Sequence, residues 1–574
     1  MKTRRFIADM KDQFFLPFFT IILFLVAAIN LSLIVWSLNK GFDFTDEAWA
    51  YSLVKSGRDT VNEPWGFHWV LNPIYDLFGQ SVLAFRYLRL IAYFILGLLT
   101  FHVLRRSVNF GLLSNKYRNW ILFPATQIGT FVAFSYAPPY ISYNELSAWL
   151  VQIIGILLIS LNSSNNRVFL KWGLIGFYLG ILSVSKISSF LLVAISLLFI
   201  LIFYRTCFVT NILVCFSGFV SACLLLVLFA FPFNAYFRNN FTLFTDKELQ
   251  TEYAHPISGM VKKYLIDVVY FPSRYPLVIA IFVLFVISIL FKNKLNAIFV
   301  NVVFAVGFLA SFILLREELR WNQIGAFIFL CILVNLTFAA VRFLKPDQGS
   351  KRSLPEISVV FFATLSPLFA GFGTSNPILG QMLFASTLLF GILALNLLVF
   401  LGTKCVFPIS VLSLWSLVFV LIATLQAPYG NQDLTKSKFS TSAEDLSGIK
   451  VESNRQARIN AYVDMKKYVA DLSLISIDNP GALFLSSNDN FANPWINYKT
   501  WPASFLSIDS ACQGAQKNEI GIFIDSEMAE DEKLLARLNT SLRSCSLQFP
   551  NDFEILKSYD IAEFSSDQRL WVTR

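Results

Sequence analysis

The sequence predicts an all-α polytopic membrane protein of about 13 transmembrane helices, followed by a small extracytoplasmic α/β domain at the C-terminus. Two observations predict the membrane part. Of the 574 residues 56% are hydrophobic and only 14% are charged, and apolar runs long enough to cross a bilayer recur along the chain. A third observation, the polar and acidic composition after residue 425, predicts the separate domain. This composition excludes a soluble globular protein.

Apolar runs of about 17 to 25 residues, bounded by charged or turn-forming residues, mark the predicted spans. They lie near residues 14–36, 82–104, 119–137, 145–162, 168–185, 188–204, 210–232, 276–291, 296–315, 323–343, 357–373, 377–401 and 405–425. The first run has no short apolar core and no small-residue cleavage site, so we expect a retained helix and no signal peptide. An odd number of spans places the two termini on opposite faces.

The distribution of basic residues predicts which face is cytoplasmic. Residues 1–425 carry a net charge of +14, whereas residues 426–574 carry −5. Of the 31 Lys and Arg residues of the membrane part, 18 fall in alternate loops that begin with the N-terminus, as the positive-inside rule predicts. We therefore expect a cytoplasmic N-terminus and a periplasmic C-terminus, and the compact loops favour a bacterial inner membrane. The same rule explains the basic charge without nucleic-acid binding.

This orientation divides the chain into three parts. Residues 1–425 form the predicted membrane domain, with long outer loops at 37–81 and 233–275, and residues 426–447 form a polar linker. In the predicted domain 448–574, a helix is expected around Arg455 to Leu472, strands at Ala482–Leu485 and Ile520–Ile524, and a charged helix around Ala529 to Leu538. Cys512 and Cys545 are the only cysteines of this region, so an extracytoplasmic location predicts a disulfide between them.

Candidate chemistry is concentrated in the first outer loop. The predicted spans are nearly free of charged residues, which disfavours an ion-coupled transporter. The segment GFDFTDEAWAYSLVKSG places Asp46 and Glu47 side by side just beyond the first span. These carboxylates either act on a substrate at the membrane surface or complement the dipole of a short helix capped by Thr45. In the first case we expect substitution of either to leave expression and the melting temperature nearly unchanged, and at least one of the two substitutions to lower transfer strongly.

The sequence that follows the acidic pair resembles a known family. Tyr51 and Gly57 precede PWGFHWVLNPIYDLFGQSVLAFRYLRL, which runs from Pro64 into the second span. An acidic pair, a Tyr, a His/Pro/aromatic stretch, Phe-Gly-x-Ser and Arg at the head of span two resemble the GT-C superfamily of integral-membrane glycosyltransferases. The resemblance is closest to the branch of protein O-mannosyltransferases and the lipid A aminoarabinose transferase. It implies a GT-C-like fold and a sugar donor linked to polyprenyl phosphate.

The resemblance also implies roles for particular residues. It makes Asp46 and Glu47 the catalytic pair, with Asp46 as the leading acid that deprotonates the acceptor. PPYISYNELSAWL places Glu145 near the start of the fourth span, SVSKISSF places Lys186 in a tight outer turn, and REELRWNQ adds two arginines to the outer face. The substrate-binding residues implied are Tyr51, His68, Arg86, Arg89, Glu145, Lys186, Arg316 and Arg320. For Glu145, Lys186 and the two loop arginines, helix-end decoration, snorkelling or simple solvation is the alternative.

The expected function is transfer of a hexosyl or pentosyl unit, with inversion, from a polyprenyl-phosphate-linked donor to a glycan, lipid or protein acceptor in cell-envelope polysaccharide biosynthesis. One alternative is a polysaccharide polymerase or ligase that uses lipid-linked oligosaccharides, with its chemistry around residues 233–275. Another is a non-enzymatic lipid or solute carrier. Oxygen ligands at Asp46 or Glu47 suit a divalent Mg or Mn ion, and the sequence leaves its presence open. The three histidines have no zinc-ligand spacing with cysteine.

Overall fold

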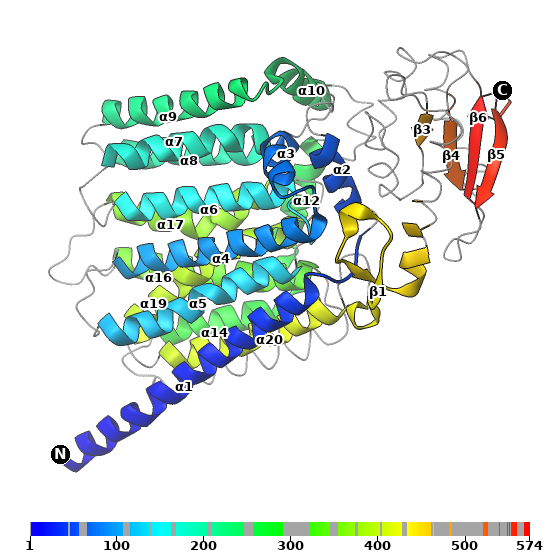
Figure 1. Cartoon of the computed structure of the whole chain (residues 1–574). Coiled ribbons are helices and arrows are strands. Elements are labelled where there is room, and N and C mark those ends of the chain that lie inside the picture. The colour runs from blue at the N-terminus through cyan, green and yellow to red at the C-terminus, as the bar shows by residue number, and fades with distance from the viewer. Residues whose placement is uncertain are drawn as a thin grey trace.

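A computed structural model shows a bundle of roughly parallel helices with smaller elements gathered at one end (Figure 1). The structure describes residues 2–43, 46–56, 66–106, 115–136, 139–161, 168–203, 208–245, 257–290, 321–344, 354–373, 377–401, 405–426, 433–457, 459–460, 463, 482–484, 521–525, 539, 548, 550–551, 553–559 and 568–573. Cys512, Cys545, Arg316 and Arg320 lie outside these residues, and so does the predicted span 296–315.

The bundle is built from long apolar helices. They are α1 (Lys2–Ser37), α4 (Val82–Arg106), α5 (Asn115–Tyr136), α6 (Tyr143–Leu161), α7 (Val168–Ser185), α8 (Ile187–Phe203), α9 (Phe208–Leu228), α14 (Pro276–Leu290), α16 (Trp321–Leu344), α17 (Leu354–Gly371), α19 (Ser386–Leu401) and α20 (Val406–Gln426). Within the described residues, eight helical segments are long and apolar enough to cross a membrane, and α8 and α17 are shorter apolar helices. The chain is therefore a multi-pass integral membrane protein, and the count of thirteen spans stays a prediction.

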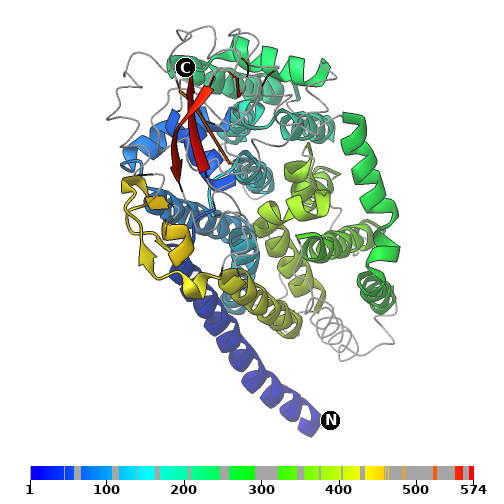
Figure 2. The same cartoon turned by 90° about the vertical axis from the view of Figure 1, so that its right-hand side faces the viewer.

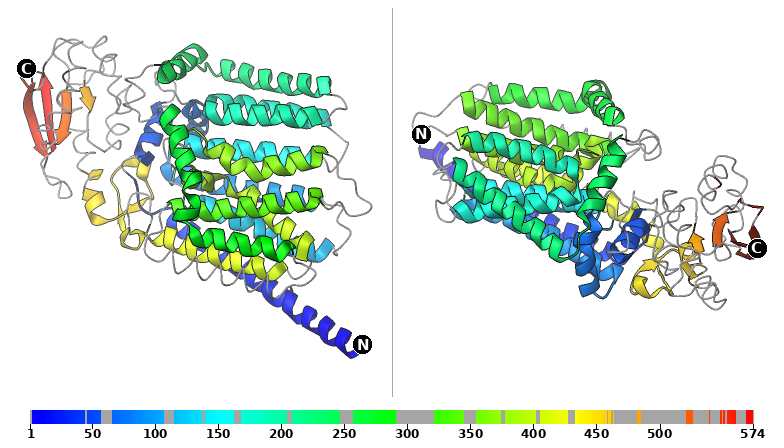
Figure 3. Two further views of the ribbon diagram at one scale, coloured as in Figure 1. Left: turned by 180° about the vertical axis from the view of Figure 1, so that it is seen from behind. Right: turned by 90° about the horizontal axis from the view of Figure 1, so that it is seen from above.

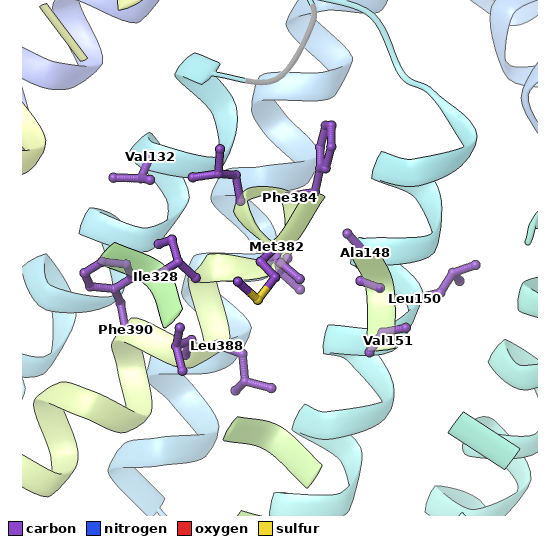
Figure 4. Packing of buried hydrophobic residues seen from close by; sticks show 14 of the residues in the cluster. Val132, Ala148, Leu150, Val151, Ile328, Met382, Phe384, Leu388 and Phe390 are labelled. Atoms are coloured by element: carbon purple, nitrogen blue, oxygen red, sulfur yellow. The ribbon is translucent and has the colours of Figure 1, made fainter. Parts of the chain in front are cut away.

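One predicted span is interrupted. The run expected at 377–401 comprises α18 (Ile378–Gln381), the 3₁₀ segment η2 (Met382–Ala385) and α19. Gln152 on α6 supports the interruption, because its Oε1 accepts a hydrogen bond from the Leu388 N–H at 2.9 Å. Apolar side chains of α5, α6 and α16 surround it, as Val132, Ala148 and Ile328 do in Figure 4. The buried amide allows the helix to change its pitch inside an apolar core.

Short helices cover one end of the bundle, which we call the loop end. The predicted outer loop 37–81 contains α2 (Asp46–Ser56) and α3 (Phe67–Leu77), and the predicted loop 233–275 contains α10 (Phe233–Thr245), α12 (Ile257–Val269) and α13 (Phe271–Arg274). Figures 1 and 3 show these helices at the same end as the C-terminal elements, while the N-terminus of α1 extends from the opposite end. Figure 2 faces the loop end and shows the bundle helices end-on. The candidate site lies here.

The chain after α20 returns to the loop end. Part of the predicted linker is folded: η4 (Leu434–Lys436), β1 (Phe439–Ser440), η5 (Glu444–Leu446) and β2 (Lys450–Val451) follow one another, and β1 pairs antiparallel with β2. Farther along, a four-stranded sheet has the order β3 (Ala482–Phe484), β4 (Gly521–Asp525), β6 (Gln568–Thr573), β5 (Phe553–Tyr559). β3 and β4 coincide with the two predicted strands, and β5 and β6 were not predicted. The charged helix expected around 529–538 lies outside the described residues.

Candidate active site

Arg86 organises the acid loop, which we define as residues 38–47. Its guanidinium on α4 is only 1% exposed and donates to the carbonyl oxygens of Leu38, Lys40 and Gly41 at 2.9 to 3.1 Å. Nε and Nη2 also donate to the Glu47 carboxylate at 2.7 to 2.9 Å. Since an arginine has five N–H donors and these contacts use all of them, Arg86 keeps none for a ligand. In this structure the Arg86 side chain holds the acid loop in place, and the substrate binding expected of it stays a prediction.

Glu47 is fully buried and is held from two sides. Besides its ion pair with Arg86, its Oε2 accepts the Asp43 N–H at 3.0 Å, while its own N–H donates to Asp43 Oδ2 at 3.1 Å. Burial raises the pKa of Glu47, and the Arg86 charge opposes that rise. Because removal of one partner would leave a buried charge unpaired, these contacts lead us to expect that Glu47 is needed for folding.

Asp46 differs from its neighbour in what the structure describes. Its backbone begins α2, whereas its side chain lies outside the described part of the chain. The adjacent Glu47 and the nearby Asp43 are both committed to contacts within the acid loop.

A second buried ion pair lies three residues farther along α4. Arg89 Nε donates to both carboxylate oxygens of Glu145, at 2.8 and 2.9 Å, and Nη2 donates to the Phe134 carbonyl at 3.0 Å. The guanidinium also lies over the Phe134 ring, 4.2 Å from its centroid. Positions i and i+3 share one face of a helix, so Arg86 and Arg89 point their ion pairs to the same side of α4. No described residue accepts a hydrogen bond from Arg89 Nη1.

Lys186 is a buried amine whose described hydrogen-bond partners are neutral oxygens. It lies in the turn between α7 and α8, is 4% exposed, and donates to Asn144 Oδ1 and to the Ala370 carbonyl, both at 2.8 Å. The described residues place no carboxylate within ion-pair distance of it, in contrast to Arg86 and Arg89. Asn144 and Glu145 are consecutive residues of α6, so Lys186 and Arg89 bind neighbouring positions of one helix. Burial lowers the pKa of Lys186 to about 7, and a bound anion would favour its protonated form.

Tyr51 is a buried residue of α2 near both Arg86 and Arg89. It is 4% exposed, packs against Tyr75 and Phe85, and lies within electrostatic reach of Glu47, Arg86 and Arg89. Among the described residues, its hydroxyl has no hydrogen-bond partner. Burial raises the pKa of Tyr51 well above its usual value, so the phenol stays a neutral donor. An unpartnered buried hydroxyl costs stability unless a ligand or water satisfies it.

Helix α3 joins α2 to the region around Lys186. The Gly66 N–H donates to the Val184 carbonyl of α7 at 3.0 Å, and a Cβ at Gly66 would lie only 2.5 Å from that oxygen, so the approach requires glycine. Phe67 packs against both Trp49 of α2 and Tyr143 of α6, and the Lys186 amine lies 5.9 Å from the Tyr143 ring centroid. His68 is buried on the same turn of α3. The structure thus brings most of the expected site residues to one region.

One residue that sequence reasoning missed is Arg455. Its Nη1 donates to the Phe42 carbonyl of the acid loop at 2.9 Å. The two residues are 413 positions apart and no local pattern connects them, so the sequence offers no signal for the contact. Within the described residues, no group of three or more His, Cys, Asp or Glu side chains is placed to hold a metal ion.

Comparisons of the chain with protein-family models, with curated proteins and with solved structures give no match.

Proposed function

We propose that this membrane protein is a glycosyltransferase of the GT-C type that uses a polyprenyl-phosphate-linked sugar as donor. The observation that carries the proposal is Lys186, a buried cation whose partners are neutral oxygens. Such a site favours an anionic ligand, because an anion would compensate the charge that the described residues leave unpaired. The Tyr51 hydroxyl and Arg89 Nη1 add two unused donors in the same region. A phosphate accepts hydrogen bonds from such donors.

The proposed reaction is a single displacement at the anomeric carbon. The acceptor hydroxyl or amine attacks, its bond to the sugar carbon forms, and the bond from that carbon to the phosphate oxygen breaks. Asp46 takes the proton of the acceptor as general base. The polyprenyl phosphate leaves as an anion, and Lys186 stabilises its charge. Glu47 and Arg86 keep the acid loop in place, and inversion at the sugar carbon follows from one displacement.

The proposal gives Lys186→Met a measurable effect. A hydrogen bond to a charged group contributes about 1.5–3 kcal/mol, so we expect kcat/KM for a radiolabelled polyprenyl-phosphate sugar to fall by about 10- to 100-fold. Because the wild-type amine loses its proton as pH rises through about 7, the apparent KM of the wild type should also rise above that pH. The variant should lose this pH dependence.

Lys171→Met is the matched control. Lys171 lies near the other end of α7 and likewise donates to a carbonyl, that of Ser160. We expect its transfer rate to stay near that of the wild type. Equal transfer by both variants would refute the role of Lys186. Transfer of preassembled blocks would favour the polymerase or ligase alternative, and no transfer by the wild type would favour a carrier.

The proposal also requires the loop end to face away from the cytoplasm. A reporter enzyme that works only outside the cytoplasm should be active when fused after Arg574 and inactive when fused after Arg106. The reason is the excess of Lys and Arg in the loops of the other face. Activity of the Arg106 fusion, or inactivity of the Arg574 fusion with the protein intact by immunoblot, would contradict the orientation.

A further inference from the structure

An apolar groove runs along the lipid-facing side of α1 to the loop end. Leu25, Ala28, Ile29, Ser32, Leu33 and Trp36 of α1 line it together with Leu425 of α20, and its volume is about 460 Å³. The first and last of the α1 residues are 58% and 38% exposed. Figure 1 shows α1 beside α20, with β1 at the loop end of the pair.

The groove has the length of one lipid leaflet. From Leu25 to Trp36 a helix with a rise of 1.5 Å per residue extends about 16 Å, which is close to half of a hydrocarbon core of about 30 Å. One hydrocarbon chain of a lipid in the leaflet at the loop end would therefore fit along it. The Trp36 ring marks the level at which such a chain would meet the headgroup region, where tryptophan is enriched.

Three lysines are held together just beyond this end of the groove. Lys40 Nζ lies over the Trp36 ring, 3.6 Å from its centroid. Lys40 also forms a parallel bridge with Lys450, and the Lys450 N–H donates to the Asn39 carbonyl at 2.7 Å. The Lys438 N–H donates to the Val451 carbonyl at 3.1 Å, which adds a third lysine to the same small sheet.

The positive charge of this cluster is not compensated by the described part of the protein. None of the described carboxylates lies within ion-pair distance of Lys40, Lys438 or Lys450, and nearby Asp433 pairs with Lys436 at 3.3 Å. Burial and the like charges of Lys450 and Lys438 all lower the pKa of Lys40. Like charges placed directly opposite each other in a sheet are destabilising. An anion bound between them would relieve this repulsion.

We infer that this site binds one anionic phospholipid, whose hydrocarbon chain lies in the α1–α20 groove and whose phosphate is bound by Lys40, Lys438 and Lys450. The apolar groove and the lysine cluster meet at Trp36, so they match the two ends of one amphipathic ligand. The site shares Lys40 with the acid loop but contains neither Lys186 nor the acidic residues of that loop, and it would bind lipid whether or not the protein transfers sugars.

Native mass spectrometry of the purified full chain tests the site. The protein is incubated with equal amounts of phosphatidylglycerol and phosphatidylcholine that carry the same acyl chains. We expect one phosphatidylglycerol to be retained in preference to phosphatidylcholine. Each lysine near a membrane surface contributes about fivefold to binding of anionic lipid, so Lys438→Gln with Lys450→Gln should weaken retention by about 30-fold. Equal retention of the two lipids by the wild type would overturn the inference.

Two further measurements separate a lipid from other occupants. Lys262→Gln with Lys263→Gln removes two exposed lysines of α12 at the same end of the bundle and should leave retention unchanged. Ala28→Trp fills the groove without altering the cluster and should lower retention at least several-fold. Glycerol phosphate should not displace the lipid at matched concentration. An equal loss in the α12 control, full retention by Ala28→Trp, or displacement by glycerol phosphate would each refute the inference, provided circular-dichroism melting curves show folded variants.

Discussion

We expect Asp46→Asn to lower sugar transfer by at least about 100-fold and to leave the melting temperature nearly unchanged. Loss of a general base commonly costs 10²- to 10⁴-fold in rate. The contacts within the acid loop strengthen this expectation, because Glu47 is bound to Arg86 and to the Asp43 N–H and is not free to accept a proton from a substrate. Transfer from a radiolabelled polyprenyl-phosphate sugar to the membrane acceptor measures the effect.

Asp76→Asn is the matched control for this prediction. Asp76 is an exposed carboxylate of α3 at the same end of the bundle, and it accepts a hydrogen bond from Gln80 Nε2. We expect its transfer rate and melting temperature to stay close to those of the wild type. Full activity of Asp46→Asn would place the general base elsewhere, although the glycosyltransferase assignment would survive if Glu145→Gln abolished transfer.

The sequence predicts the bundle helices well because bilayer thickness fixes their length. The run expected at 168–185 matches α7, and the run expected at 82–104 ends two residues before α4 does. The short helices α10 and α12 lie in the segment predicted as the loop 233–275 and were not predicted. Each combines an apolar face with polar residues, so neither has the continuous apolar run that marks a span. The interruption at Met382 depends on the amide of Gln152, which is 236 residues away from its partner Leu388.

The candidate site shows the same division between local and distant information. The chemical types of the site residues could be found in short motifs around positions 46, 86, 145 and 186. Their partners could not, because Glu47 pairs with a residue 39 positions away and Lys186 donates to a carbonyl 184 positions away. This difference matters for Arg86, whose residue type suggested substrate binding. Its contacts with three acid-loop carbonyls make it a structural partner of Glu47.

Glu47→Gln should lower the free energy of unfolding by about 3–5 kcal/mol, the usual cost of removing one partner from a buried ion pair. Both side chains are at most 1% exposed, so water cannot replace the lost contact. Arg86→Met should cost more, because it also leaves the carbonyls of Leu38, Lys40 and Gly41 without their donor. Denaturant unfolding in detergent, followed by circular dichroism, measures both.

Two further variants test whether the loss of stability comes from the buried ion pair between Glu47 and Arg86. Glu47→Gln with Arg86→Met removes both charges, so it should cost less than the sum of the single changes. The double variant should still be less stable than the wild type, because the carbonyls of Leu38, Lys40 and Gly41 still lack the Arg86 donor. Lys436→Gln breaks an exposed ion pair with Asp433 and should change stability by no more than about 1 kcal/mol. If Glu47→Gln were as mild as Lys436→Gln, the ion pair with Arg86 would not hold the acid loop, and Glu47 would return as a candidate base beside Asp46.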